Sequence, residues 1–334
     1  MRLHTAGILL VVLLSAFTGS AAAPLPKTAN LATPAVGSLY NAIGVGLATV
    51  ISRNTPMTVR VQTYAGPPAW LPSMESGDTG LGVLTSADAV TSYKGIVIYK
   101  KRFTNTRILV VGGSLKLGFY VAKNSDIQTV SDLKGKRIPA DFPGAPIVKL
   151  SSMAGLATAG LGYGDIVRIP VSDLRAGAQA FLEGRTDAAW HAVGSPAVQE
   201  ANARISGGIR FIPLASTPQA ARLMGEIYPG SYPSVLKGGM AAGIDKDTSL
   251  LTADIYLVAG GTLSDDAAYE IVKVLWEKNK DLGPVHPALR QWTRTRMMSD
   301  KAFIPYHPGA IRFFKEKRLW NREMDNLQAR LLKE

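Results

Sequence analysis

The 334-residue sequence contains no cysteine, which excludes disulfide bonds, thiolate metal sites and cysteine nucleophiles. Histidine is nearly as scarce: beyond His4 there are only His191, His286 and His307, too far apart for a local H-x-x-x-H metal motif. The sequence also lacks the G-x-S-x-G nucleophile elbow and the phosphate-binding G-x-x-x-x-G-K-[ST] loop. We therefore predict no metal, no cofactor and no enzymatic activity.

Acidic residues are the minority among the charges, with 25 Asp and Glu against 37 Lys and Arg, for a formal net charge of +12. The basic residues are spread along the chain and are not interleaved with aromatic residues as on a nucleic-acid-binding module. The composition therefore predicts a soluble basic surface and no nucleic-acid partner. A weak attraction for anionic ligands is the second interpretation.

The first 23 residues have the order of a secretory signal peptide. Arg2 and His4 precede the apolar run AGILLVVLLSAF, and the small residues AAA follow at 21–23. This run is shorter than the roughly 20 apolar residues that a membrane-spanning helix needs. We predict export to the periplasm with cleavage near Ala22 or Ala23, and an uncleaved anchor is the alternative.

Strand patterns alternate with helix patterns in the rest of the chain. Strands are predicted over 58–63, 80–84, 107–111 and 117–122, with Gly112-Gly113-Ser114 as a hairpin-type connection between the last two. Further strands are predicted over 137–140, 166–169 and 187–190, and apolar residues at helical spacing predict helices around 40–51 and 268–275. This alternation is typical of an α/β fold with largely parallel sheets.

The loops that follow the predicted strands are where a ligand could bind. Ligands of α/β sheets bind beyond the carboxyl ends of the strands, and the starts of helices favour anions. The loops at 33–40, 64–67, 85–88, 141–146 and 191–196 fit this description. The candidate ligand-binding residues are Gly37, Ser38, Tyr40, Tyr64, Thr85, Ser86, Phe142, Gly144, Ala145, His191 and Gly194.

These residues have predicted roles. Backbone groups of Gly37 and Gly144 and the hydroxyls of Ser38 and Ser86 would hold a carboxylate. Tyr40 and Tyr64 would form walls, and His191 would make binding depend on pH.

Each role has a structural alternative. The two glycines could serve only to permit turns, and Tyr40 and His191 could belong to the core. Asp88 is predicted to cap the following helix. On paper, Ser86, Asp88 and His191 could also form a catalytic set.

Five segments, taken in order, resemble the TAXI family, the solute receptors of one branch of the tripartite ATP-independent periplasmic (TRAP) transporters. They are TPAVGSLYNAIG (33–44), VRVQTYAG (59–66), SDLKGKRIPADFPGAP (131–146), DAAWHAVGSP (187–196) and IPYHPGAIRFFKE (304–316). The resemblance implies a two-lobed periplasmic-binding-protein fold of type II, with two mixed, mostly parallel sheets, helices on both faces and a two-segment hinge. Residues 24–122 and 245–334 would form lobe 1 and residues 123–244 would form lobe 2, with crossings near 122–124 and 243–247.

The resemblance also implies a function. The chain would be a monomeric periplasmic receptor that captures a small organic acid or amino acid, most simply a carboxylate, and delivers it to TRAP membrane permease subunits. Binding would close the lobes about the hinge. A receptor of an ABC-type transporter and a periplasmic ligand sensor remain open as alternatives, because both need the same cleft.

The sequence departs from the family pattern at two ligand loops. Ala35-Val36 stand where the family has more glycine and a hydroxyl, and 144–147 read GAPI where the family has Gly-Ser-Gly-Thr. Each lost hydrogen bond to a charged group would weaken binding by roughly 1.5–3 kcal/mol. We therefore predict that Phe142, Tyr64 and Trp190 favour a more apolar or aromatic acid.

Overall fold

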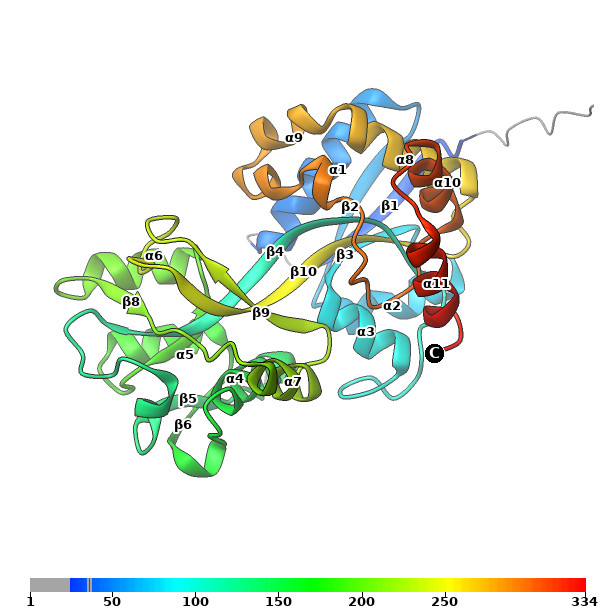
Figure 1. Cartoon of the computed structure of the whole chain (residues 1–334). Coiled ribbons are helices and arrows are strands. Elements are labelled where there is room, and N and C mark those ends of the chain that lie inside the picture. Colours follow the sequence, from blue (N-terminus) through cyan, green and yellow to red (C-terminus); the bar gives the residue numbers. More distant parts are fainter. Residues whose placement is uncertain (1–24, 35, 37, 144) are drawn as a thin grey trace, which may run out of the picture.

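Two α/β lobes lie side by side and are joined by two long strands (Figure 1). The computed structural model describes residues 25–334 except 35, 37 and 144, so the predicted signal peptide lies outside the described residues. Strands β4 (Thr106–Ala122) and β10 (Thr248–Gly260) pair antiparallel and run from one lobe into the other. The two-lobed α/β fold expected from the sequence is confirmed.

The first lobe is built on β1 (Thr28–Pro34), β2 (Thr58–Tyr64) and β3 (Leu81–Thr85), in the order β2-β1-β3-β10-β4. Strand β1 pairs parallel with β2 and β3, and β10 pairs antiparallel with β3 and β4. The helices of this lobe are α1 (Leu39–Asn54), α2 (Pro67–Ser76), α3 (Ser86–Lys94), α8 (Asp265–Glu277), α9 (Asn279–Val285), α10 (Pro308–Glu316) and α11 (Arg322–Leu331). In Figure 1, α1, α8 and α9 lie on one side of the sheet and α2 and α3 on the other.

The second lobe continues from the same two strands. Strands β7 (Ala189–Ala192) and β8 (Ile209–Phe211) pair antiparallel with β4, and β9 (Ser231–Leu236) pairs antiparallel with β10. Strands β5 (Arg137–Asp141) and β6 (Val167–Val171) form a parallel pair. The helices here are α4 (Pro146–Ala157), α5 (Leu174–Leu182), α6 (Pro196–Arg204) and α7 (Pro218–Ile227). The large sheet is mixed, as predicted, but mostly antiparallel, because β4 and β10 run antiparallel to every strand that pairs with them.

Four short 3₁₀ turns complete the described elements. They are η1 (Val130–Leu133), η2 (Tyr163–Asp165), η3 (Pro287–Gln291) and η4 (Arg294–Arg296). No helix within the described part of the chain combines the length and the apolar character needed to cross a membrane.

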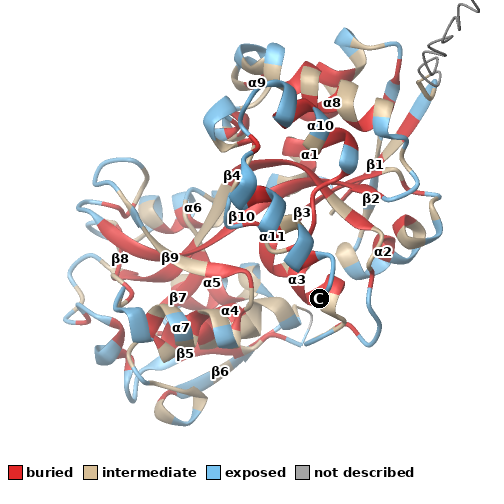
Figure 2. Ribbon diagram, turned by 45° about the vertical axis from the view of Figure 1, so that its right-hand side comes forward, coloured by how far each residue is buried: buried red, intermediate tan, exposed pale blue. Residues whose placement is uncertain are grey.

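Burial divides each crossing strand between two cores (Figure 2). In β4, residues 108–111 pack in the core of the first lobe, and residues 117–121 pack in the cores of the second. In β10, residues 255–259 belong to the first lobe, and Leu250 and Leu251 belong to the second. The lobes therefore meet near 112–116 and 252–254, earlier in β4 and later in β10 than the sequence indicated. Both strands run on through the crossing, although the register of their pairing shifts between Asp254 and Tyr256.

The predicted hairpin connection at Gly112-Gly113-Ser114 is wrong. Strand β4 runs through these residues as a single strand of 17 residues. A Cβ atom at Gly112 would lie 2.1 Å from Cε2 of Trp292, so only glycine allows the strand to approach this ring. The two glycines therefore mark close packing against the η3 segment, and not a turn.

A histidine stands at the start of helix α10. His307 precedes Pro308, and its Nδ1 accepts a hydrogen bond of 3.2 Å from the N–H of Gly309. His307 is buried, and its Nε2 lies 3.0 Å from the carbonyl oxygen of Leu263. It therefore acts as a helix cap, and Pro308 occupies the first turn of the helix, where proline is favoured.

Candidate functional site

A cavity of about 890 Å³ lies between the two lobes. The first lobe contributes the starts of α1 and α3 and the segment 65–68, and the second contributes the starts of α4 and α6 and the end of β7. The middle of β4, residues 113–117, lines the cavity at the crossing. The volume is within the range of small-molecule binding sites, roughly 300–1,000 Å³.

Six of the predicted ligand-binding residues line this cavity. Ser38, Tyr40 and Thr85 come from the first lobe, and Ala145, His191 and Gly194 come from the second. Gly37 and Gly144 lie outside the described residues. The fold therefore brings together loops that are far apart in the sequence, as expected for the carboxyl ends of strands. Their roles toward a ligand stay predictions.

The start of α1 holds Ser38 and Tyr40 at the cavity. Ser38 is the helix cap, and its Oγ accepts a hydrogen bond of 3.1 Å from the N–H of Asn41. The side chain of Asn41 donates to Oγ1 of Thr33 at 3.0 Å, which fixes the helix to the end of β1. Burial raises the pKa of the Tyr40 hydroxyl, so Tyr40 presents a neutral hydroxyl to the cavity.

The start of α3 places a carboxylate at the cavity. Thr85 caps the helix: its Oγ1 accepts from the N–H of Asp88 at 3.0 Å and donates to Asp88 Oδ2 at 2.7 Å. Asp88 is partly exposed, and it lines the cavity. Burial raises the pKa of its carboxyl group, while the bonds from Thr85 lower it. Thr85 is thus the cap that the sequence analysis assigned to Asp88.

In the second lobe, His191 presents a neutral ring. Its Nδ1 accepts from the N–H of Ala192 at 2.9 Å and lies 2.9 Å from Oγ of Ser195. Because Nδ1 is an acceptor, the ring proton is on Nε2. Burial lowers the pKa of His191 to about 4. The ring is therefore neutral at neutral pH, and a dependence of binding on pH through His191 stays a prediction.

Residues 31–317 match the NMT1-like family. The chain belongs to the NMT1-like family. Solved structures with a similar fold include one described as a periplasmic transporter, at 13% identity and a TM-score of 0.54, with 92% of this chain and 97% of that chain covered. A TctC solute-binding protein from Polaromonas has 13% identity and a TM-score of 0.51, with 92% and 98% covered. XAC2383 from Xanthomonas citri bound to ATP has 11% identity and a TM-score of 0.51, with 91% and 99% covered. These likenesses establish the α/β periplasmic-binding-protein fold of this NMT1-like protein.

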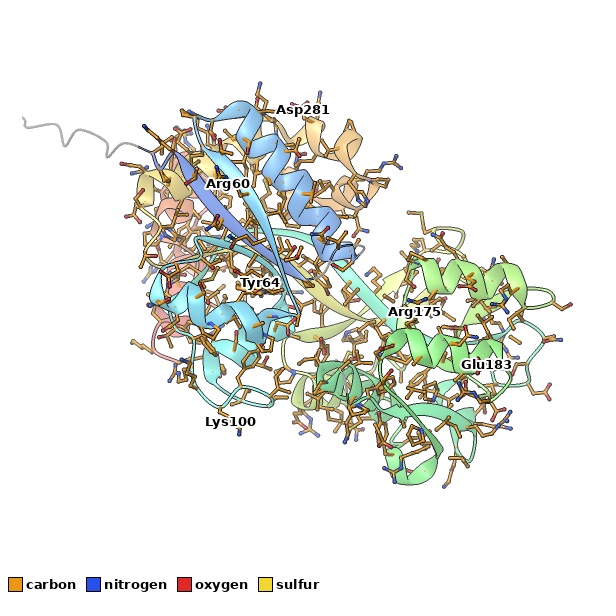
Figure 3. The ribbon with its side chains drawn as sticks, turned by 180° about the vertical axis from the view of Figure 1, so that it is seen from behind. Arg60, Tyr64, Lys100, Arg175, Glu183 and Asp281 are labelled. Atoms are coloured by element: carbon orange, nitrogen blue, oxygen red, sulfur yellow. The ribbon has the colours of Figure 1, made fainter. Side chains whose placement is uncertain are left out.

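Three predicted site residues of the NMT1-like chain do not line the cavity: Tyr64, Ser86 and Phe142. Tyr64 lies at the end of β2 (Figure 3), and its hydroxyl donates to Oε1 of Gln62 at 3.1 Å. Ser86 is fully buried, and its Oγ donates to the carbonyl oxygen of Gly230 at 2.6 Å and accepts from the N–H of Asp254 at 3.0 Å. Ser86 therefore joins the first lobe to the crossing, and its partners come from segments that the local sequence could not place beside it.

Phe142 and Trp190 are core residues of the second lobe. Phe142 is buried against Val171 and Ala180. Trp190 is also buried, and its Nε1 donates to Oγ of Ser151 at 3.0 Å. The predicted aromatic wall of Phe142, Tyr64 and Trp190 is therefore absent from the described lining. Both Phe142 and Trp190 adjoin lining segments, but their side chains point into packed interiors.

The sequence analysis missed several lining residues. Aliphatic side chains make most of the wall, among them Leu39, Ile43, Ile98, Leu115 and Ile147. They belong to apolar patterns that predict core, so only their position at the cavity distinguishes them. Tyr228 also lines it from the end of α7. Asp88 belongs to the predicted ligand loop at 85–88, but the sequence analysis gave it a capping role. Its position shortly after a fully buried strand was a signal that its side chain faces a ligand.

Proposed function

We propose that this NMT1-like protein is a periplasmic solute-binding protein that captures a small organic acid or amino acid and delivers it to TRAP-type membrane permease subunits. The observation that carries the proposal is the cavity of about 890 Å³ with walls from both lobes. A solute that touches both walls binds the closed arrangement more tightly and shifts the population toward it. The likeness in fold to a periplasmic transporter and to a TctC solute-binding protein supports this function.

The crossing strands supply a physical basis for closure. The ladder between β4 and β10 shifts register between Asp254 and Tyr256, at the place where the two cores meet. Such irregularities bend and twist a strand pair locally. Closure can therefore bend the strands near 112–116 and 252–254 without breaking either core.

Binding is tested on the full-length chain expressed in a bacterium and purified from the periplasmic fraction. Solute that co-purifies is removed by unfolding and refolding, and melting temperatures are measured with amino acids, dicarboxylates and aromatic acids. A ligand at a hundred times its Kd adds about 2.7 kcal/mol to the free energy of unfolding. A selective shift without chemical change of the solute supports a receptor, and turnover of the solute contradicts it. Absence of the chain from the periplasm contradicts the location.

Delivery is tested by uptake of the identified solute into cells that make TRAP permease subunits. Uptake that needs this chain, depends on an ion gradient and persists when ATP is depleted supports the TRAP assignment. Uptake that stops with ATP depletion while the gradient is maintained contradicts it.

A further inference from the structure

Among the described residues that line the cavity, Asp88 is the one with a carboxylate, and the ammonium group of Lys116 is hydrogen-bonded to residues outside this lining. Of the described lining residues, two are of a charged type other than histidine, Asp88 and Lys116. The ammonium group of Lys116 donates to Oγ of Ser234 at 2.6 Å and to Oγ1 of Thr252 at 3.4 Å. These hydroxyls belong to β9 and β10 and are not part of the described lining. Lys116 therefore lines the cavity, but its ammonium group is hydrogen-bonded to hydroxyls of β9 and β10.

Two histidines also line the cavity, His191 and His286. Nδ1 of His191 accepts a backbone hydrogen bond from Ala192, and Nδ1 of His286 accepts one from Ala288 at 3.2 Å. Burial lowers the pKa of His191, and its acceptor nitrogen carries no proton, so the His191 ring is neutral and supplies no cation.

Asp88 has no charged partner within the described part of the chain. Its carboxylate accepts a hydrogen bond from the hydroxyl of Thr85, and no ion pair within 4.0 Å involves it. Its electrostatic neighbours are the hydroxyls of Tyr40, Tyr99 and Tyr228, whose pKa values it raises. A desolvated carboxylate without a counter-charge is costly, and a ligand cation removes that cost.

The opposite wall offers a donor. The neutral His191 ring has its proton on Nε2, and Nδ1 is occupied by its two partners. His191 lines the cavity from the second lobe, whereas Asp88 lines it from the first. A solute that engages both groups therefore spans the two lobes. The rest of the described lining is largely aliphatic.

We propose that Asp88 binds the ammonium group of an apolar amine or amino acid, and that Nε2–H of His191 donates to an oxygen of those solutes that carry one. This inference rests on the proposed solute-binding function and narrows it, because a plain carboxylic acid does not satisfy Asp88. An anionic group beside Asp88 would add like-charge repulsion in a site of low dielectric. The apolar body of the solute would pack against the aliphatic wall.

The test uses two matched sets of probes on the full-length chain, by calorimetric titration. One set is leucine, 3-methylbutylamine and 4-methylpentanoate, and the other is phenylalanine, 2-phenylethylamine and 3-phenylpropanoate. Within each set the apolar body is similar, and the ammonium or the carboxylate is removed. We expect the members with an ammonium group to bind and the plain acid to bind at least about 10-fold more weakly.

Asp88→Asn removes the charge and keeps the shape, and its amide oxygen can still accept the Thr85 hydroxyl. It should weaken binding of the amines by about 10- to 100-fold. Asp78→Asn is the matched control, since it removes the same charge from an exposed site on the first lobe and should leave affinity unchanged. The melting temperature without solute verifies that both variants are folded.

Solute that co-purifies with the wild-type chain gives an independent measurement. It is released by unfolding, treated with an amine-reactive label and analysed by mass spectrometry. A labelled product supports the inference. A released acid without an amine, or equal affinity of Asp88→Asn for the amines, overturns the inference and leaves the proposed function standing. If nothing is released, and neither these probes nor the amino acids, dicarboxylates and aromatic acids of the melting assay bind, the proposed function fails as well.

Discussion

Replacing Gly112 with alanine should destabilise the protein through one close contact. A Cβ atom there would lie 2.1 Å from Cε2 and 2.3 Å from Cζ2 of Trp292, well inside van der Waals distance. The Trp292 ring is buried, so it cannot move into solvent without losing packing. Overpacking of this kind costs about 1–3 kcal/mol.

Gly113→Ala is the matched control for Gly112→Ala. A Cβ atom at Gly113 would approach no closer than 3.3 Å, to Cβ of Gln291. The restriction that alanine places on the unfolded chain offsets this mild contact, so Gly113→Ala should be nearly neutral. The two alanine variants should therefore differ by about 1–3 kcal/mol in the free energy of unfolding.

Urea denaturation of both variants measures this difference, with the slope m verifying that the same surface is exposed on unfolding. Equal stability of the two variants would refute the reasoning, because it would mean that the η3 segment moves away from β4 at no cost. The contact also bears on binding: Ala288 and Gln291 of η3 line the cavity, so displacement of Trp292 in Gly112→Ala should also change solute affinity.

Two further predictions concern buried polar groups. Ser86→Ala removes hydrogen bonds to Gly230 and Asp254 and should cost about 1–3 kcal/mol in urea denaturation. Ser92→Ala on the same helix should be nearly neutral, because its hydroxyl bonds only a helix carbonyl; equal losses for the two variants would contradict this account. His191 has a pKa near 4 in the fold and an ordinary pKa of 6.5, so the unfolded chain binds its proton first as pH falls. Stability should therefore be full above pH 6.5 and decline between pH 6.5 and 4 by on the order of 3 kcal/mol, and circular dichroism melts should show a smaller decline for His191→Asn.

Local signals predicted the elements well where each element carries its own boundary. The helix predicted around 40–51 is α1, since Ser38 caps it and its apolar residues recur at helical spacing. The His-Pro pair at 307–308 begins α10 for the same local reason. The strand patterns at 58–63 and 80–84 correspond to β2 and β3.

Predictions failed where a distant segment decides the outcome. Gly112 and Gly113 have the composition of a turn, and the packing of Trp292 makes them part of a strand. Thr85 and Ser86 are adjacent hydroxyl residues at one helix start, and only Thr85 lines the cavity. Ser86 is turned toward Gly230 and Asp254, which are far away in sequence.

The sequence by itself therefore determined the alternation of strands and helices, the helix starts and the set of loops that could reach a ligand, because these depend on periodicity and on capping within a few residues. Tertiary structure alone decided which side chains of those loops face the cavity, where β4 and β10 cross between the lobes, and that Asp88 lies at the cavity without a counter-charge. Those outcomes depend on contacts between segments that are distant in sequence. A side chain becomes buried or finds a distant partner only when these segments pack together.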